Sequence, residues 1–223
     1  EIPTYPYKRE WLSRRTMWPF YFKDAFRRNR LKNIVDRIAI LTDDDTVFGI
    51  PTLKIHNGIM VDAIAPVSLH EDEEVINLIA VSACLPVHGY ERCIRGLADY
   101  YNGADSGRRI VKFHMVGEGG ELDLYKSLVK KYHLEKYVIF YGKKTGKELD
   151  AIYDRADIAM GAFAFYKAGI TISSTLKMKE YLAKGLPAVS GCYEDSFGKD
   201  DVDFYLGFAN DDSTVDIEKV VRF

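Results

Sequence analysis

From residue 76 onward, short runs of apolar and β-branched residues alternate with longer segments of helical periodicity. The strand-like runs are 76–82, 109–116, 137–141, 157–162 and 187–190, with a further short run at 203–206. The helix-like segments between them are 89–101, 121–132, 147–155 and 174–184, and Gly185 follows the last as a typical helix-ending residue. This alternation predicts an α/β fold, in which a parallel sheet carries helices on both faces.

Composition and charge restrict the function further. Hydrophobic residues make up 47% and charged residues 29% of the 223 residues, which is typical of globular proteins. A net charge of -2 argues against wholesale binding of nucleic acid. The three cysteines, Cys84, Cys93 and Cys192, form no C-x-x-C pair, so we expect neither disulfides nor structural zinc but a reducing cytoplasm.

Basic and aromatic residues are mixed near the amino terminus. The basic residues are Arg14, Arg15, Lys23, Arg27, Arg28, Arg30 and Lys32, and Trp11, Trp18, Phe20, Tyr21, Phe22 and Phe26 lie among them. The favoured interpretation is a solvated helix, predicted over 21–35, whose apolar stripe packs on a core. An anionic membrane surface is the first alternative and nucleic acid the weaker one.

Ligands of parallel α/β sheets bind beyond the carboxyl ends of the strands, so functional residues are expected in the loops that follow the strands. After the first strand, His88 and Gly89 stand at the mouth of a helix, where phosphate binds readily. After the next strand, GEGG at 117–120 permits a tight turn with close backbone approach. It lacks the third glycine of a dinucleotide fingerprint, because position 122 is Leu122, so NAD binding is a minor alternative. Lys143 and Lys144, between two glycines, can contact a phosphate or a base, or form a solvated turn.

The richest loop spans residues 166–181. Ser173, Ser174 and Thr175 are candidate side-chain caps for the helix that they open, whose amino end would favour an anion. Glu180 lies about one and a half turns into that helix, where a carboxylate can accept two hydrogen bonds from a diol such as ribose. An anion and a diol at these positions indicate a nucleoside diphosphate. A capped helix with a surface glutamate is the alternative.

Four motifs, in this order and spacing, resemble the carboxyl-terminal half of retaining glycosyltransferases of the GT-B type, family 4. They are HGYER at 88–92, VGEG at 116–119, VIFYG at 138–142 and LKMKEYLAKGLP at 176–187. TYPY at 4–7 and NGI at 57–59 resemble the tail of the amino-terminal domain in bacterial polysaccharide-assembling members. The resemblance implies a Rossmann-like donor domain over 72–223, and a remnant of the acceptor domain with its linker over 1–71.

The resemblance also implies roles for individual residues. Glu180 matches the glutamate that bonds the ribose, and the amides of Ser174, Thr175 and Leu176 match the pyrophosphate cradle. Lys143 and Lys144 match the loop that touches the base. His88 and Lys167 fall where the family carries basic residues facing the donor, and both are predicted to be catalytic. Residues expected to contact the donor also include Gly89, Gly117, Gly169 and Lys177.

The chain departs from the family pattern at two positions. The first glutamate of the usual Glu-x7-Glu pattern falls at Ile172, and the usual arginine of the first loop falls at Cys84. A degenerate, non-catalytic subunit is therefore the leading alternative to an active transferase. The acidic runs at 43–45 and 200–203 do not follow the strands that build the site, so we expect no metal and no cofactor.

The expected partners are a nucleotide sugar and a glycan or lipid-linked acceptor, in the cytoplasm or on the inner face of its membrane. Because the chain opens on EIPTY rather than Met, we expect a fragment. The resemblance implies an active cleft between two domains, so we expect this chain to be inactive alone.

Overall fold

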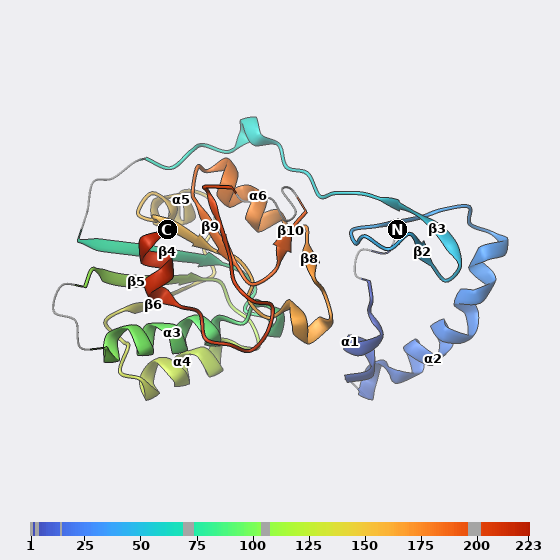
Figure 1. Cartoon of the computed structure of the whole chain (residues 1–223), viewed down its shortest axis with the longest axis horizontal. Helices are drawn as coiled ribbons and strands as arrows, with labels where there is room; N and C mark the ends of the chain where they lie inside the picture. Colours follow the sequence, from blue (N-terminus) through green and yellow to red (C-terminus); the bar gives the residue numbers. More distant parts are fainter. Residues whose placement is uncertain (1, 3–4, 14, 69–73, 104–107, 196–201) are drawn as a thin grey trace.

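The computed structural model describes residues 2, 5–13, 15–68, 74–103, 108–195 and 202–223 (Figure 1). Its centre is a sheet of six parallel strands in the order β6-β5-β4-β7-β9-β11. The strands are β4 (Val75–Val81), β5 (Ile110–Val116), β6 (Val138–Gly142), β7 (Ile158–Met160), β9 (Ala188–Ser190) and β11 (Tyr205–Gly207). The strand order reverses direction beside β4, which places a topological switch point between β4 and β7.

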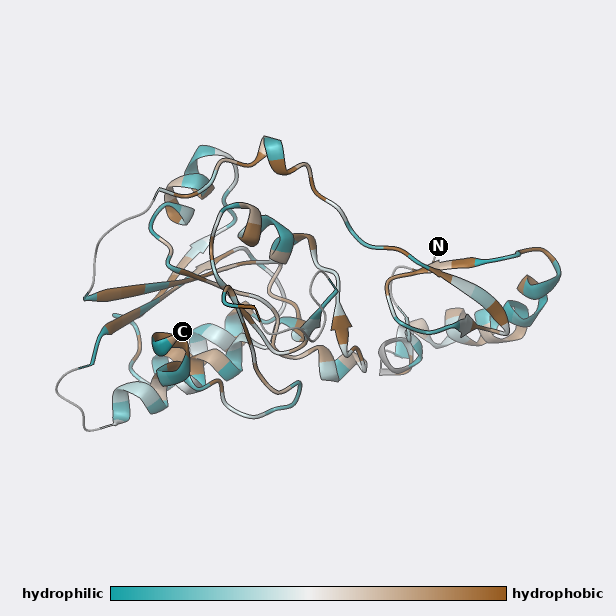
Figure 2. Ribbon diagram, turned by 45° about the horizontal axis from the view of Figure 1, so that its top comes forward, coloured by the Kyte–Doolittle hydropathy of each residue, from teal (hydrophilic) through white to brown (hydrophobic). Residues whose placement is uncertain are grey.

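Helices cover both faces of this sheet, as the alternating pattern predicts. Those that pack on it are α3 (Tyr90–Asn102), α4 (Leu122–Lys131), α5 (Lys147–Tyr153), α6 (Leu176–Ala183) and α7 (Ile217–Arg222). Figure 1 shows α3 and α4 on one side and α5 and α6 on the other. Leu78 and Ala80 of β4 belong to the core beneath α3 and α4, whereas Ile79 belongs to the core beneath α5 and α6. Since side chains alternate along a strand, β4 must be apolar at successive positions, and Figure 2 shows β4 and β5 as predominantly hydrophobic.

A smaller unit precedes the large sheet. It contains α1 (Lys8–Ser13), α2 (Trp18–Arg27) and a three-stranded sheet in the order β1-β3-β2. Its strands are β1 (Ile38–Ile40), β2 (Thr46–Val47) and β3 (Ile50–Lys54), and its core is formed by Ile38, Ile40, Val47 and Ile50. From β3 the chain runs towards β4 along α6, where the amide of Val67 donates to the carbonyl of Lys184 over 2.9 Å.

The apolar stripe predicted over 21–35 packs on a core only in part: Leu31 and Val35 lie against the core of the smaller unit, whereas the stripe of α2 itself does not. Tyr21 is the buried residue of this helix. Trp18, Phe22 and Phe26 recur every fourth residue and are 42%, 60% and 76% exposed. Among the described residues, no helix combines the length and apolarity needed to cross a membrane.

Several local predictions differ from the structure. The helix predicted over 21–35 is α2 followed by a 3-10 helix (Arg28–Asn33), and the last predicted strand is β11. A two-stranded parallel sheet of β8 (Ile172–Ser173) and β10 (Tyr193–Glu194) was not predicted, because strands of only two residues are too short to show an alternating pattern. Thr4, Arg14 and positions 200–201 of the second acidic run lie outside the described residues.

Candidate functional site

The loops after β4 and β7 meet at the switch point. The amides of Phe163 and Ala164 donate to the carbonyls of His88 and Val87 over 2.8 and 3.1 Å. Gly89 makes this approach possible, since its φ is +61° and a Cβ there would lie 2.6 Å from the Cβ of Ala164. The predicted positions His88 and Gly89 therefore do stand at the mouth of α3, against the loop after β7.

His88 is folded back on its own turn. Its Nδ1 accepts a hydrogen bond from the Leu85 amide at 3.0 Å, which places the ring proton on Nε2. Burial, reinforced by the charge of Lys177, lowers the pKa of His88 to about 3. The imidazole is thus neutral at physiological pH and can offer a hydrogen-bond donor but no positive charge.

The turn after β5 packs against the loop after β4. Gly117 has a φ of +127°, and a Cβ on it would lie 1.8 Å from the carbonyl oxygen of Ser82. Its amide donates to the carbonyl of Gly142, at the end of β6, over 2.8 Å. The glycine therefore serves close backbone approach, as its sequence context predicts.

The amino end of α6 lacks the side-chain cap that the sequence predicts. Thr175 is the N-cap residue, but no side chain caps the helix, and its Oγ1 is buried without a partner. The Oγ of Ser174 instead accepts from the Asn57 amide at 3.1 Å, so residues before the large sheet contact this loop. Uncapped amides at residues 176–178 leave the positive end of α6 open to an anion.

Glu180 lies farther along α6 and is half-buried. Its Oε1 accepts a hydrogen bond from the hydroxyl of Tyr153 on α5 over 3.2 Å. Burial raises the pKa of Tyr153, so its hydroxyl stays protonated and acts as the donor. The sequence gives no sign of this role for Tyr153, because its spacing indicates only that it belongs to the core-facing side of α5.

The predicted lysines have different surroundings. Lys144 pairs with Glu148 on α5 at 2.8 Å, while Lys143 is exposed in the loop after β6. Lys167 lies in the loop after β7 and pairs with Glu91 of α3 at 2.6 Å. Although burial opposes protonation, the hydrogen bond to Glu91 raises the pKa of Lys167. Its charge is therefore already balanced by a carboxylate.

Lys177 contacts two other elements of the large sheet unit. Its Nζ donates to the Tyr90 hydroxyl at 3.2 Å and to the Gly161 carbonyl at 3.1 Å, so it joins α6 to α3 and to the end of β7. Burial lowers the pKa of Lys177 to about 7.

Glu194 lies on β10, is 1% exposed and interacts electrostatically with Lys177. The strand register places it opposite Ser173, and neither Oε2 of Glu194 nor Oγ of Ser173 has a hydrogen-bond partner. Burial raises the pKa of Glu194 to about 8. No pattern in the sequence signals this burial, since it depends on the unpredicted pairing of β8 with β10.

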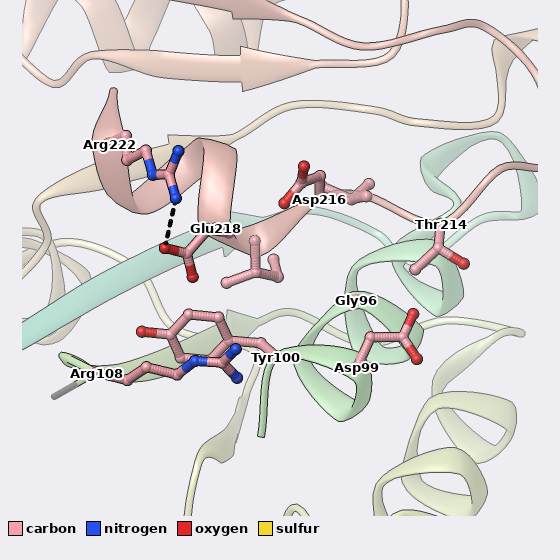
Figure 3. Close-up of a pocket in the computed structure, with 10 residues that line it drawn as sticks. Gly96, Asp99, Tyr100, Arg108, Thr214, Asp216, Glu218 and Arg222 are labelled. Carbon is pink, nitrogen blue, oxygen red and sulfur yellow. Dashed lines mark hydrogen bonds and ion pairs between the residues drawn. The ribbon is translucent and has the colours of Figure 1, made fainter. Parts of the chain in front are cut away.

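Two cavities accompany these elements. The larger, about 510 Å³, lies between the second half of α3 and the segment 214–222, which contains α7 (Figure 3). There Arg108 stacks on Tyr100, and Arg222 pairs with Glu218 at 3.1 Å. None of the predicted site residues lines it. The second, about 380 Å³, lies between the amino-terminal unit and the loop before α6, and its lining includes Tyr5, Asp44, Gly169 and Ile172.

Comparison with known proteins supports the resemblance seen in the sequence. A family model described as glycosyl transferases group 1 matches residues 64–190, more than half of the chain. A search of curated protein sequences gives no significant match.

Solved structures of glycosyltransferases share the fold. A glycosyltransferase from Rickettsia africae aligns with a TM-score of 0.62 at 11% identity, covering 86% of this chain and 55% of that one. Sucrose-phosphate synthase from Thermosynechococcus elongatus has a TM-score of 0.58 at 17% identity, with coverages of 78% and 44%. HepE from Anabaena, solved with UDP and glucose, has a TM-score of 0.55 at 14% identity, with coverages of 77% and 46%.

The chain thus spans about half the length of these proteins, with a Rossmann-like sheet of the GT-B type. The chain belongs to the group 1 family of glycosyl transferases.

Proposed function

We propose that this chain binds a nucleoside-diphosphate sugar at the switch point and is the donor-binding portion of a retaining glycosyltransferase. The observation that carries the proposal is the uncapped amino end of α6, whose Lys177 contacts Tyr90 on α3 and Gly161 after β7, with Glu180 farther along the same helix. This arrangement offers donors to a diphosphate and a carboxylate to a diol on one element.

The other predicted residues complete the donor site in this proposal. The diphosphate accepts hydrogen bonds from the amides of Thr175 and Leu176, and Glu180 accepts from the ribose hydroxyls. Gly117 lets the donor approach the backbone of the turn after β5. Lys143, exposed after β6, reaches the base.

The reaction balances without a protein nucleophile. The bond between the anomeric carbon and the β-phosphate oxygen breaks, and its electron pair leaves with the nucleoside diphosphate. The acceptor hydroxyl oxygen bonds to the same face of that carbon, and its proton passes to the departing phosphate oxygen. The protein then stabilises the charge on the leaving group through fixed donors, without a metal.

We place the acceptor at the cavity that lies between Asp44 and the loop containing Gly169. Carboxylates and a tyrosine edge suit the hydroxyl groups of a glycan, which can belong to a lipid-linked acceptor. The aromatic stripe of α2, flanked by Lys23, Arg27 and Arg30, would seat the chain on an anionic membrane surface at its cytoplasmic face.

The donor site is tested by replacing Glu180. Glu180→Ala removes a charged hydrogen-bond acceptor and is expected to weaken nucleoside-diphosphate binding by about 1–2 kcal/mol, measured by isothermal titration calorimetry. Glu135→Ala, which removes an exposed carboxylate near the end of α4, is the matched control and should bind like the wild type. Equal affinity in both variants would remove Glu180 from the site.

The membrane surface is tested by co-sedimentation with vesicles. The wild type should bind vesicles containing phosphatidylglycerol at low salt, and a Trp18, Phe22, Phe26 triple serine variant should bind much less. No binding to the anionic vesicles by the wild type would exclude this part of the proposal.

A further inference from the structure

Lys177 is a basic side chain that contacts elements on both sides of the switch point, α3 after β4 and the end of β7. Two of its three N–H donors reach the Tyr90 hydroxyl and the Gly161 carbonyl, and its ammonium lies 5.5 Å from the centre of the Tyr90 ring. Its backbone belongs to the first turn of α6, whose amide donors are uncapped. The side chain therefore extends from the uncapped first turn of α6 to the start of α3 and the end of β7.

Lys177 differs from the neighbouring lysines in what balances its charge. Lys167 pairs with Glu91, Lys179 with Asp195 at 2.9 Å, and Lys184 with Asp150 at 3.1 Å. Within the described part of the chain, no carboxylate lies within ion-pairing distance of Lys177. A half-buried ammonium with only neutral partners is costly, and an anion bound beside it would remove that cost.

The groups around this ammonium do not supply a competing cation. His88 is neutral, and burial raises the pKa of the Cys84 thiol. The titratable groups that face Lys177 come from four surrounding segments: Cys84 and His88 after β4, Tyr90 and Cys93 on α3, Cys192 after β9, and Glu194 on β10. Burial raises the pKa of Glu194 to about 8, and Glu194 favours the protonated form of Lys177 without forming a direct ion pair with it.

We propose that Lys177 is a catalytic residue that binds the β-phosphate of the donor and stabilises the negative charge which that phosphate gains as the sugar leaves. The inference rests on the proposed nucleoside-diphosphate donor. When the anomeric carbon–oxygen bond breaks, the electron pair passes to the phosphate oxygen beside Lys177, and the acceptor proton follows to that leaving group. Lys177 stays protonated throughout and transfers no proton in this step.

If Lys177 has this role, binding of a nucleoside diphosphate is accompanied by a net uptake of protons. Because the free protein holds Lys177 with a pKa of about 7, the side chain is largely neutral at pH 7.5. A bound diphosphate restores the charged form, so binding at that pH takes up roughly half a proton or more. A lysine that only joined α6 to β7 would show no such uptake.

The experiment compares wild type, Lys177→Met and Lys177→Arg. Each is titrated calorimetrically at pH 7.5 with the best binder among UDP, GDP, ADP and CDP, in two buffers of different ionisation enthalpy. Lys126→Met, which removes an exposed charge on α4, is the control, and circular dichroism verifies folding of every variant. The difference in apparent enthalpy between the buffers gives the number of protons taken up.

We expect Lys177→Met to lose roughly ten- to a hundred-fold in affinity together with the excess proton uptake. Lys177→Arg, always charged, should keep most of the affinity and also lose the uptake. Unchanged affinity and uptake in Lys177→Met, with binding by the wild type, would overturn the role of Lys177 alone. If Lys177→Met does not fold, unchanged uptake in a folded Lys177→Arg variant overturns it equally. A wild type that binds none of the four diphosphates would instead refute the proposed function itself.

Discussion

Replacing Gly89 by alanine tests how the loops after β4 and β7 build the site. Gly89 has a φ of +61°, and the added Cβ would meet the Ala164 Cβ at 2.6 Å and the Ala164 nitrogen at 2.9 Å. The left-handed conformation alone costs an alanine roughly 1–2 kcal/mol. Forcing the two loops apart adds roughly 1–3 kcal/mol, by analogy with overpacked cores. We therefore expect Gly89→Ala to lower the free energy of unfolding by about 2–5 kcal/mol.

Gly185→Ala is the matched control. Gly185 ends α6 with a φ of +79°, and a Cβ there would meet nothing within 4 Å. It carries the same left-handed strain without the contact, so its expected cost is roughly 1–2 kcal/mol. The difference between the two variants measures the packing of the two loops.

Urea denaturation followed by circular dichroism gives both free energies, and calorimetry gives nucleoside-diphosphate affinity. Gly89→Ala should also weaken binding, because it moves the mouth of α3, whereas Gly185→Ala should not. Equal stability and equal affinity for the two variants would refute the reasoning that these loops are locked together at the ligand site.

Three further predictions concern buried charge and exposed bases. Glu194 has a pKa of about 8 in the folded chain and 4.5 as its ordinary value, so its contribution to stability is complete below pH 4.5 and is lost as pH rises towards 8. As pH rises within that window, the free energy of unfolding of Glu194→Gln should therefore increase relative to that of the wild type by roughly 1.4 kcal/mol per pH unit. Urea denaturation at pH 5, 6 and 7 measures this difference. A difference that does not depend on pH would contradict the prediction. Arg92 is fully buried and donates to the carbonyls of Phe163, Ala209 and Ser213. Arg92→Leu should therefore lower the free energy of unfolding by about 3–5 kcal/mol. A loss below about 1 kcal/mol would refute this structural role. Lys143→Ala should weaken binding of the preferred nucleoside diphosphate in calorimetry while leaving inorganic pyrophosphate unaffected, and an equal loss for both would argue against contact with the base.

The sheet and its helices could be predicted because burial on two faces leaves a strong pattern. β4, β5 and β7 are near-continuous apolar runs, and the helices between them keep a 3.6-residue period. The smaller elements could not be predicted in this way. β8 and β10 contain two residues each, and their pairing depends on contacts across about twenty residues of chain.

The positions of the candidate site residues could be predicted from the sequence better than the contacts that these residues make. Loops after parallel strands converge, so Gly89, Gly117 and the start of α6 could be placed together from their order in the chain. Partners distant in sequence could not be predicted, as with Lys167 and Glu91, which are 76 residues apart. The contact of Asn57 with Ser174, 117 residues apart in the chain, could not be predicted for the same reason.

A thermal-shift titration tests the central claim most directly. The chain is melted with increasing UDP, GDP, ADP, CDP or NADH, since a ligand that binds only the folded state stabilises it by about 2.7 kcal/mol at a hundred times its Kd. The donor site predicts a saturable rise in Tm with at least one nucleoside diphosphate, reduced in Glu180→Ala, and none with NADH. No shift with any diphosphate would contradict a donor site in this chain and favour a degenerate, non-catalytic subunit. A shift with NADH alone would favour a nicotinamide-binding protein.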